Sequence, residues 1–259
     1  MIVTKKYKAL ILAGGKSKPA LQKVTGQEYK ALMSIAKSGS KPIIHHIIEV
    51  LHNTRYVSQV YVAGPEEIEQ KIVTTTFAVT MLPSGATLPD TLKRTIPHFQ
   101  KEPYLLIITC DLPLVSVSHI EDFMDNCFGS PGFDIYYAII SKESYITLFP
   151  DNELRRIYAN LVEGSFTGGN LFLANPKVIM DCAGIIEQFI LFRKQPLKMA
   201  SILGQRLVVK YLKKYLSIRD LEKLVPQYLK GYTGKAILAA PEIALDIDKP
   251  AQLSALNNL

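Results

Sequence analysis

Hydrophobic residues along the first half of the chain occur in two alternating patterns. Short continuous hydrophobic runs predict strands buried on both faces of a parallel sheet, and hydrophobic residues recurring every three or four positions predict helices. Strands are expected at residues 7–13, 58–63, 78–82 and 104–109, and helices at residues 43–53, 66–73, 88–99 and 117–128. This βαβ rhythm predicts an α/β fold of three layers, Rossmann-like, with a mostly parallel mixed sheet.

The second half of the chain has a different pattern. Strands are expected at residues 134–140, 169–174 and 235–239, with mixed polar connections between the first two. Residues 176 to about 230 have helical spacing, with breaks at Pro196, Gly204 and Ser217. We interpret this stretch as a helical elaboration that covers one end of the sheet, and a last helix follows Pro250. Residues 1–259 are expected to form a single domain.

Composition narrows the class of protein. With 259 residues, 48% of them hydrophobic, the chain can bury a full core, but its hydrophobic runs are far shorter than a membrane span of about 20 residues. The N-terminal residues do not resemble a signal peptide. The three cysteines are widely spaced and odd in number, so a disulfide framework is not expected. We expect a cytoplasmic protein without a membrane segment.

The net charge of +7 indicates anionic partners. Apart from a cluster at residues 206–219, the lysines and arginines are scattered, and they do not alternate with aromatic residues as in RNA-binding proteins. A small substrate that carries phosphate therefore explains the charge better than a nucleic acid. A homo-oligomer is compatible with this sequence.

The first predicted strand ends in a loop suited to phosphate. Gly14 and Gly15 follow it directly, and Lys16 and Lys18 come next. Glycine lets the backbone approach a ligand closely, and phosphates bind at such strand ends in α/β proteins. The loop has neither the GxxxxGK[ST] nor the GxGxxG spacing. This favours a nucleotide ligand while excluding the commonest ATPases and dehydrogenases.

Asp111 is the first candidate for chemistry, because it follows the most hydrophobic strand, at the end where open sheets bind ligands. A carboxylate there needs a partner, and beside phosphates that partner is usually a divalent cation. The alternative is that Asp111 caps the next helix. Lys30 could reach a phosphate as a point charge, although a lysine is more often only solvated.

Two further carboxylates lie close to the C-terminal end of the sequence given. Asp246 and Asp248 alternate with Leu245 and Ile247, so both carboxylates would face the same side of an extended segment. Such a pair suits Mg²⁺, which takes one or two carboxylates together with phosphate oxygens. Asp248 could instead cap the last helix, near Pro250.

These pieces occur in the order of known nucleotidyltransferase motifs. The chain resembles the MobA-like NTP transferases, a family with a glycosyltransferase-A-like fold. The motifs that carry the resemblance are ALILAGGKSK (9–18), KAL (30–32), KPI (41–43), CDLP (110–113), TGGN (167–170) and LDIDKPAQL (245–253). They span nearly the whole chain, and six motifs in the right order are specific although each alone is weak.

The resemblance implies transfer of a nucleoside monophosphate from an NTP to a phosphorylated small-molecule acceptor, with release of pyrophosphate and with Mg²⁺ or Mn²⁺ as cofactor. It implies that the nucleotide is bound by Leu12, Ala13, Gly14, Gly15, Gly85, Thr87 and Thr91. It places the catalytic lysines at Lys30, Lys18 and Lys16, and the metal ligands at Asp111 and Asp246, with Asp248 as a close alternative to Asp246. The acceptor would lie at Gly168, Gly169 and Asn170.

One departure from the family pattern leaves alternatives open. Pro19 stands where the family loop usually carries an arginine, so the chain could be a nucleotide-binding or regulatory protein that has lost catalysis. A glycosyltransferase that uses a nucleotide sugar is a third possibility. It would need an Asp-x-Asp motif at the strand end, where this chain has only Asp111.

Overall fold

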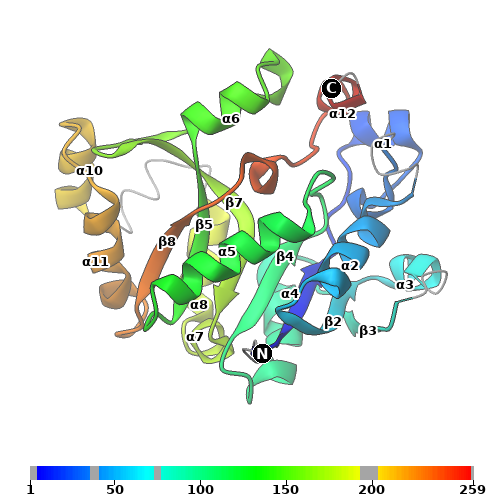
Figure 1. Ribbon diagram of the computed structural model, residues 1–259, viewed down its shortest axis with the longest axis horizontal. Coiled ribbons are helices and arrows are strands. Elements are labelled where there is room, and N and C mark those ends of the chain that lie inside the picture. Colours follow the sequence, from blue (N-terminus) through cyan, green and yellow to red (C-terminus); the bar gives the residue numbers. More distant parts are fainter. Residues whose placement is uncertain (1–4, 36–40, 73–76, 193–203, 258–259) are drawn as a thin grey trace.

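The computed structural model describes residues 5–35, 41–72, 77–192 and 204–257, which build a central sheet flanked by helices (Figure 1). In that part of the chain the sheet has eight strands, in the order β3-β2-β1-β4-β7-β5-β8, with β6 paired to β7. Only β7 runs antiparallel to its neighbours β4 and β5 along this path, so the predicted mostly parallel sheet is confirmed. The strands are β1 Tyr7–Leu12, β2 Val57–Gly64, β3 Val79–Pro83, β4 Leu105–Thr109, β5 Ile135–Ser141, β6 Ala159–Leu161, β7 Gly164–Ala174 and β8 Gly234–Leu238.

Successive residues of the central strands face two different hydrophobic cores. In β1, Ala9 and Ile11 pack on one side of the sheet, while Leu10 packs on the other. The first core contains residues from α2 Ile43–Asn53, α3 Glu66–Ile72 and α5 Val117–Gly129. The second contains residues from the 3₁₀ helix η3 Ile96–Phe99 and from α7 Pro176–Asp181. Strands buried on both faces thus produce the three layers that the hydrophobic pattern predicted.

Two segments of the chain, residues 88–99 and the connection between β5 and β7, differ from the predicted secondary structure. The helix expected at residues 88–99 is α4 Leu88–Thr95 followed by η3, because Pro97 lacks the N–H that would continue α-helical hydrogen bonding. The connection expected between β5 and β7 contains α6 Lys142–Leu148, the 3₁₀ helix η4 Asn152–Leu154 and β6, and β7 begins at Gly164 rather than at residue 169. These elements are short and half exposed, so they leave little periodic pattern.

The predicted helical elaboration is present but divides between two places. It contains α7, α8 Ala183–Phe192, α10 Gln205–Leu212 and α11 Ile218–Tyr228, with Gly204 and Ser217 directly before the last two helices. Pro196 lies outside the described residues. Helix α11 packs against the edge strand β8, whereas α7 and α8 pack against η3 and α4 on a face of the sheet. The expectation that the elaboration covers one end of the sheet is therefore only partly right.

The carboxyl ends of the parallel strands lie along one edge of the sheet, the upper edge in Figure 1. The C-terminal segment, drawn in red, crosses this edge from β8 through the 3₁₀ helix η5 Pro241–Ala244 to α12 Pro250–Asn257. There α12 packs against α1 Pro19–Thr25, which follows β1. Because of this crossing, residues from both ends of the chain meet at one sheet edge.

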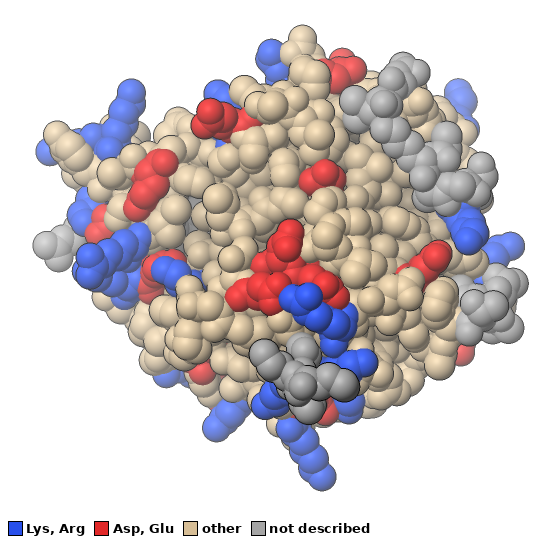
Figure 2. Space-filling model, in the orientation of Figure 1, with Lys and Arg blue, Asp and Glu red and all other residues tan. Residues whose placement is uncertain are grey.

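Two surface properties complete the description. On the face drawn in Figure 2, a group of basic side chains lies over α10 and α11 at the left and is mixed with acidic ones. Within the described ranges, the model has no helix long and apolar enough to cross a membrane.

Candidate active site

Lys30 lies at the centre of a charged cluster at this sheet edge. Its Nζ is 2.9 Å from Oδ2 of Asp111 and also forms an ion pair with Oδ1 of Asp248. Asp111 follows β4, and Asp248 belongs to the segment that crosses from β8, so the fold brings together residues that are far apart in the sequence. The Lys30 side chain is only 12% exposed, which places this ammonium group largely out of water.

Burial and charge act in opposite directions on this cluster. Burial alone would lower the pKa of Lys30, but the two carboxylates outweigh it and hold the pKa above its ordinary value. Burial alone would raise the pKa of Asp248, but Lys30 and Lys18 hold it down, to about 2. Both partners of the Lys30–Asp248 pair are therefore charged at neutral pH.

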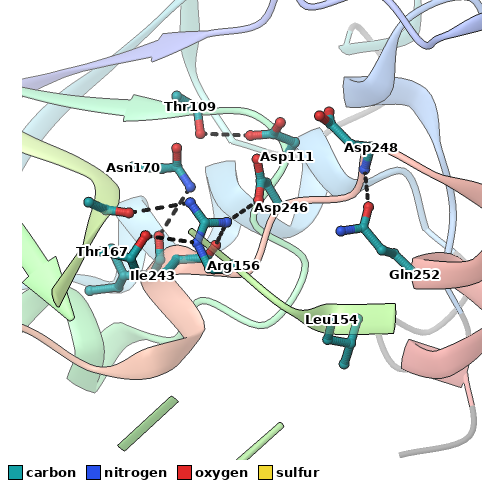
Figure 3. A network of polar contacts seen from close by, with 12 residues as sticks. Thr109, Asp111, Leu154, Arg156, Thr167, Asn170, Ile243, Asp246, Asp248 and Gln252 are labelled. Carbon is teal, nitrogen blue, oxygen red and sulfur yellow. Dashed lines mark hydrogen bonds and ion pairs between the residues drawn. The ribbon is translucent and has the colours of Figure 1, made fainter. Parts of the chain in front are cut away.

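The remaining contacts of the two carboxylates decide between the readings of the sequence. The hydroxyl of Thr109 donates to Oδ1 of Asp111 at 2.7 Å (Figure 3). Ser116 rather than Asp111 caps α5. Lys18 Nζ lies 3.0 Å from the second carboxylate oxygen of Asp248. Asp248 thus directs its carboxylate to lysines, while Gln252 accepts hydrogen bonds from the backbone N–H groups before α12. Both aspartates belong to the cluster, and the structure does not use them as helix caps.

The glycine loop is tied to Lys30 through the backbone, because the Lys30 N–H donates to the carbonyl of Gly15 at 3.0 Å. A Cβ on Gly15 would meet nothing within 4 Å, so the loop is open on that side. The side chains of the next two residues point in different directions, one to solvent and one to the interior. Lys16 is 64% exposed and pairs with Glu28 at 2.7 Å, whereas Ser17 is buried and its hydroxyl has no partner among the described residues.

The second predicted nucleotide segment lies against the glycine loop. A Cβ on Gly14 would come within 3.4 Å of the Ser84 side chain, so the loops after β1 and β3 are in contact. A Cβ on Gly85 would lie 2.4 Å from Cβ of Asp90, so only glycine fits at this turn. Thr87 caps α4, and the buried Thr91 accepts a hydrogen bond from the Gly85 N–H. The two threonines therefore build the turn that holds this segment.

The segment expected to receive the acceptor lies in β7, beside β4. A Cβ on Gly168 would lie 1.8 Å from the Tyr137 hydroxyl oxygen, and one on Gly169 would lie 2.9 Å from Cδ1 of Ile140. Both glycines are thus required for packing against β5. The Asn170 amide donates to the carbonyl of Ile243 at 3.3 Å and so connects β7 to η5.

Arg156 is a member of this network that the sequence did not single out. Its guanidinium pairs with Asp246 and donates to the carbonyl of Ala244, and its Nε lies 3.3 Å from the hydroxyl of Thr167 (Figure 3). In sequence Arg156 is one of two adjacent arginines in a polar stretch, and no local pattern distinguishes it. The structure brings it to the sheet edge because β6 and β7 form a hairpin there.

The three predicted metal ligands form ion pairs with two different cations. Asp111 and Asp248 share the ammonium of Lys30, while Asp246 pairs with Arg156. Of the predicted catalytic lysines, Lys30 and Lys18 meet at Asp248, and Lys16 turns to Glu28 instead.

The arrangement of a glycine loop, a buried lysine and two carboxylates at the carboxyl edge agrees with the sequence resemblance. The family model for the MobA-like NTP transferase domain matches residues 9–224. The chain belongs to this family. No curated protein matches the sequence.

Solved structures of transferases and synthetases resemble this chain in fold. A hypothetical transferase from Thermus thermophilus is 26% identical, with a TM-score of 0.80, and the match covers 96% of this chain and 99% of that one. 4-Diphosphocytidyl-2C-methyl-D-erythritol synthase from Anaerococcus prevotii is 8% identical, with a TM-score of 0.60 over 98% and 97% of the two chains. CMP:2-keto-3-deoxy-manno-octonic acid synthetase, solved with CTP, is 14% identical, with a TM-score of 0.57 over 98% of each chain. The last two likenesses concern the fold, and they confirm the predicted glycosyltransferase-A-like architecture.

The donor set of the cluster fits a magnesium ion that arrives with a phosphate ligand. In the described part of the chain, no group of three or more His, Cys, Asp or Glu side chains is arranged to hold a metal ion. Asp111 and Asp248 contact one ammonium, so their oxygens are close enough to share a cation. Mg²⁺ is commonly held by one or two carboxylates together with substrate phosphates. Two carboxylates beside a glycine loop meet that requirement.

Proposed function

We propose that the chain is a nucleotidyltransferase that moves a nucleoside monophosphate from an NTP to a phosphorylated small-molecule acceptor and releases pyrophosphate. The observation that carries the proposal is the buried ammonium of Lys30, placed between Asp111 and Asp248 next to the Gly14–Gly15 loop. Membership of the MobA-like NTP transferase family supports the use of an NTP. The cytidine nucleotides in the names of two solved structures of the same fold agree with it.

In this reaction an oxygen of the acceptor attacks the α-phosphorus of the NTP. A new phosphorus–oxygen bond forms, the bond from the α-phosphorus to the bridging oxygen breaks, and its electron pair leaves with pyrophosphate. The protein mainly positions the reactants and neutralises charge, since no covalent intermediate is needed. The backbone at Gly14 and Gly15 would cradle the triphosphate, and Lys30, Lys18 and Lys16 would stabilise the negative charge on the leaving group.

A divalent cation, Mg²⁺ or Mn²⁺, would neutralise phosphate oxygens at the same place when bound. Asp111 and Asp248 are the residues that would hold it. Asp246 lies two residues before Asp248 in the sequence, but it pairs with Arg156, so its role would be to order the crossing segment.

The acceptor would bind on the β7 side of the cluster. Asn170 and Arg156 lie there, next to the segment that the family resemblance assigns to the acceptor. The nucleotide side, by contrast, would be formed by the loops after β1 and β3, which contact each other at Gly14 and Ser84.

The experiment that tests the proposal has two steps. First, the four NTPs are compared with Mg²⁺ by thermal shift, because a ligand that binds only the folded state raises its stability. Second, the stabilising NTP is incubated with a panel of sugar phosphates and other phosphorylated metabolites, and pyrophosphate is measured. Asp111→Ala is expected to abolish pyrophosphate release while the protein stays folded, and the surface variant Lys93→Ala is the control for loss of a charged side chain.

The outcomes separate the proposal from the alternatives. NTP binding without pyrophosphate release from any acceptor would favour a nucleotide-binding protein without catalysis, which Pro19 at the start of α1 also favours. Release of a nucleoside diphosphate from a nucleotide sugar would indicate a glycosyltransferase. Pyrophosphate release at an unchanged rate by Asp111→Ala would contradict the assigned role of this carboxylate.

A further inference from the structure

Lys30 occupies the position that a divalent cation would take between Asp111 and Asp248. We propose that its ammonium is an internal counter-ion that competes with the metal, so that metal ion and NTP bind to this protein cooperatively. The inference rests on the proposed nucleotidyltransferase function, because it concerns the same carboxylates. In addition to the proposed reaction, the Lys30 ammonium would control when a metal ion binds to Asp111 and Asp248.

The geometry gives the first step. Two carboxylates that come together in a partly buried place repel each other unless a positive charge lies between them. Lys30 Nζ contacts one oxygen of Asp111 at 2.9 Å and one of Asp248, and its side chain is 12% exposed. Within the described chain, the second cation on this pair is Lys18, which contacts the other oxygen of Asp248 from a 55% exposed position.

The second step is competition. A metal ion bound to the same two oxygens would bring a double positive charge into contact with the ammonium of Lys30. Like charges at such a short distance repel each other strongly where the effective dielectric constant is lower than that of bulk water. Among the described residues, the hydrogen-bond partners of the Lys30 ammonium are these two carboxylates, so without a nucleotide it stays on them and the metal binds weakly.

The third step is release. The triphosphate of an NTP offers oxygens to Lys30 from the neighbouring Gly14–Gly15 loop, to which the Lys30 backbone is already hydrogen-bonded. When the ammonium moves to these oxygens, it leaves the carboxylates free for the metal. Each ligand then raises the affinity for the other by the same factor, as linkage requires.

The test measures binding of Mn²⁺ alone by electron paramagnetic resonance, with no nucleotide or acceptor present. Lys30→Met removes the ammonium while keeping an unbranched hydrophobic side chain, and it is expected to bind Mn²⁺ about tenfold more tightly than the wild type. Lys16→Met is the matched control, because Lys16 forms a β-bridge with Tyr29, next to Lys30, but its ammonium pairs with Glu28. It removes the same charge and is expected to change Mn²⁺ affinity by less than about twofold, as expected for an exposed charge screened by water.

A second measurement adds an NTP analogue with a methylene bridge between the α- and β-phosphates, which cannot release pyrophosphate. In the wild type the analogue is expected to tighten Mn²⁺ binding more than it does in Lys30→Met, where no ammonium has to move. If Lys30→Met does not fold, as judged by circular dichroism, Lys18→Met provides the same test with a smaller expected gain.

Mn²⁺ affinity that is unchanged or weaker in the folded Lys30→Met variant would overturn the inference. The same holds for equal analogue effects in the two proteins. These readouts need no turnover, so they remain interpretable if no acceptor is found and the proposed function fails. Conversely, normal pyrophosphate release by the wild type together with unchanged Mn²⁺ affinity in Lys30→Met would contradict only the counter-ion role.

Discussion

The guanidinium of Arg156 pairs with the carboxylate of Asp246, 90 positions later in the chain. The same guanidinium donates to the carbonyl of Ala244 and to the hydroxyl of Thr167, so it joins the C-terminal segment to β7. The two charged side chains are 20% and 28% exposed. Because Asp248 lies two residues after Asp246, this ion pair also fixes the segment that delivers Asp248 to Lys30.

Replacing Arg156 with lysine is therefore expected to destabilise the protein although the charge is kept. Lysine cannot reproduce several donors in one plane, so the contacts to Ala244 and Thr167 would be lost. We expect a loss of about 1–3 kcal/mol in the free energy of unfolding, measured with urea. A double-mutant cycle with Asp246→Asn is the control, and a coupling energy near zero would contradict the assigned ion pair.

Gly168 is needed for packing, and this requirement can be tested independently of the role in acceptor binding that the sequence predicts. Alanine at this position would place Cβ 1.8 Å from the Tyr137 hydroxyl oxygen, and Tyr137 is itself stacked on Phe172. Gly168→Ala is expected to cost about 1–3 kcal/mol of unfolding free energy. Gly184→Ala is the matched control: it lies in α8, where a Cβ would meet nothing within 4 Å, and it is expected to stabilise by up to about 1 kcal/mol.

The double variant Gly168→Ala/Tyr137→Phe tests the cause. Removing the hydroxyl leaves the ring carbon Cζ as the nearest atom, at 2.9 Å, so part of the stability is expected to return. Equal stability of Gly168→Ala in the presence and absence of the hydroxyl would show that the clash does not cause the loss. The loss of stability would then arise from other contacts of Gly168 in β7.

The sequence predicts the first half of this fold well because its elements carry strong local patterns. The helix expected at residues 43–53 is α2 with the same bounds, since its buried residues recur every three or four positions after Pro42. The run at residues 104–109 forms β4, which is buried on both faces at the centre of the sheet. At the C-terminal segment, Leu245 and Ile247 are buried as their alternation with aspartates predicted.

What the sequence does not predict depends on contacts between distant residues. The alternation of Asp246 and Asp248 places both carboxylates outside the core, but only the fold assigns one to Arg156 and the other to Lys30. Strand β6 has three residues and no hydrophobic alternation, so it exists through its pairing with β7. Gly168 is explained only by the position of a tyrosine on another strand.

The cysteines give a third prediction. Cys110, Cys127 and Cys182 are all buried and unpaired by disulfides, and burial raises the pKa of each thiol. The folded protein is therefore expected to react with a thiol reagent such as DTNB only as fast as it unfolds, and the denatured protein is expected to react at all three positions at once. The variant Gln188→Cys, on the exposed side of α8, should react immediately in the folded state and serves as the positive control. Rapid reaction of a native cysteine would contradict its buried position.

Asp248 gives a prediction about acid stability. Its pKa is about 2 in the folded protein, against an ordinary value of 3.8, because Lys30 and Lys18 outweigh the effect of burial. A carboxyl whose pKa is depressed by folding stabilises the protein above its unfolded pKa, and this contribution is lost as the pH falls through the folded pKa. The stability lent by Asp248 is therefore fully present at pH 5 and disappears between about pH 4 and pH 2.

Urea unfolding of the wild type and of Asp248→Asn isolates the contribution of the Asp248 carboxylate to stability, because asparagine does not titrate. We expect the difference in unfolding free energy between the two proteins to shrink by about 2 kcal/mol from pH 5 to pH 2. The same comparison in a Lys30→Met background is the control. It should change less with pH, since the ammonium that depresses the pKa most is gone. A difference that stays constant from pH 5 to pH 2 in the wild-type background would mean that Lys30 does not hold Asp248 ionised in the folded protein.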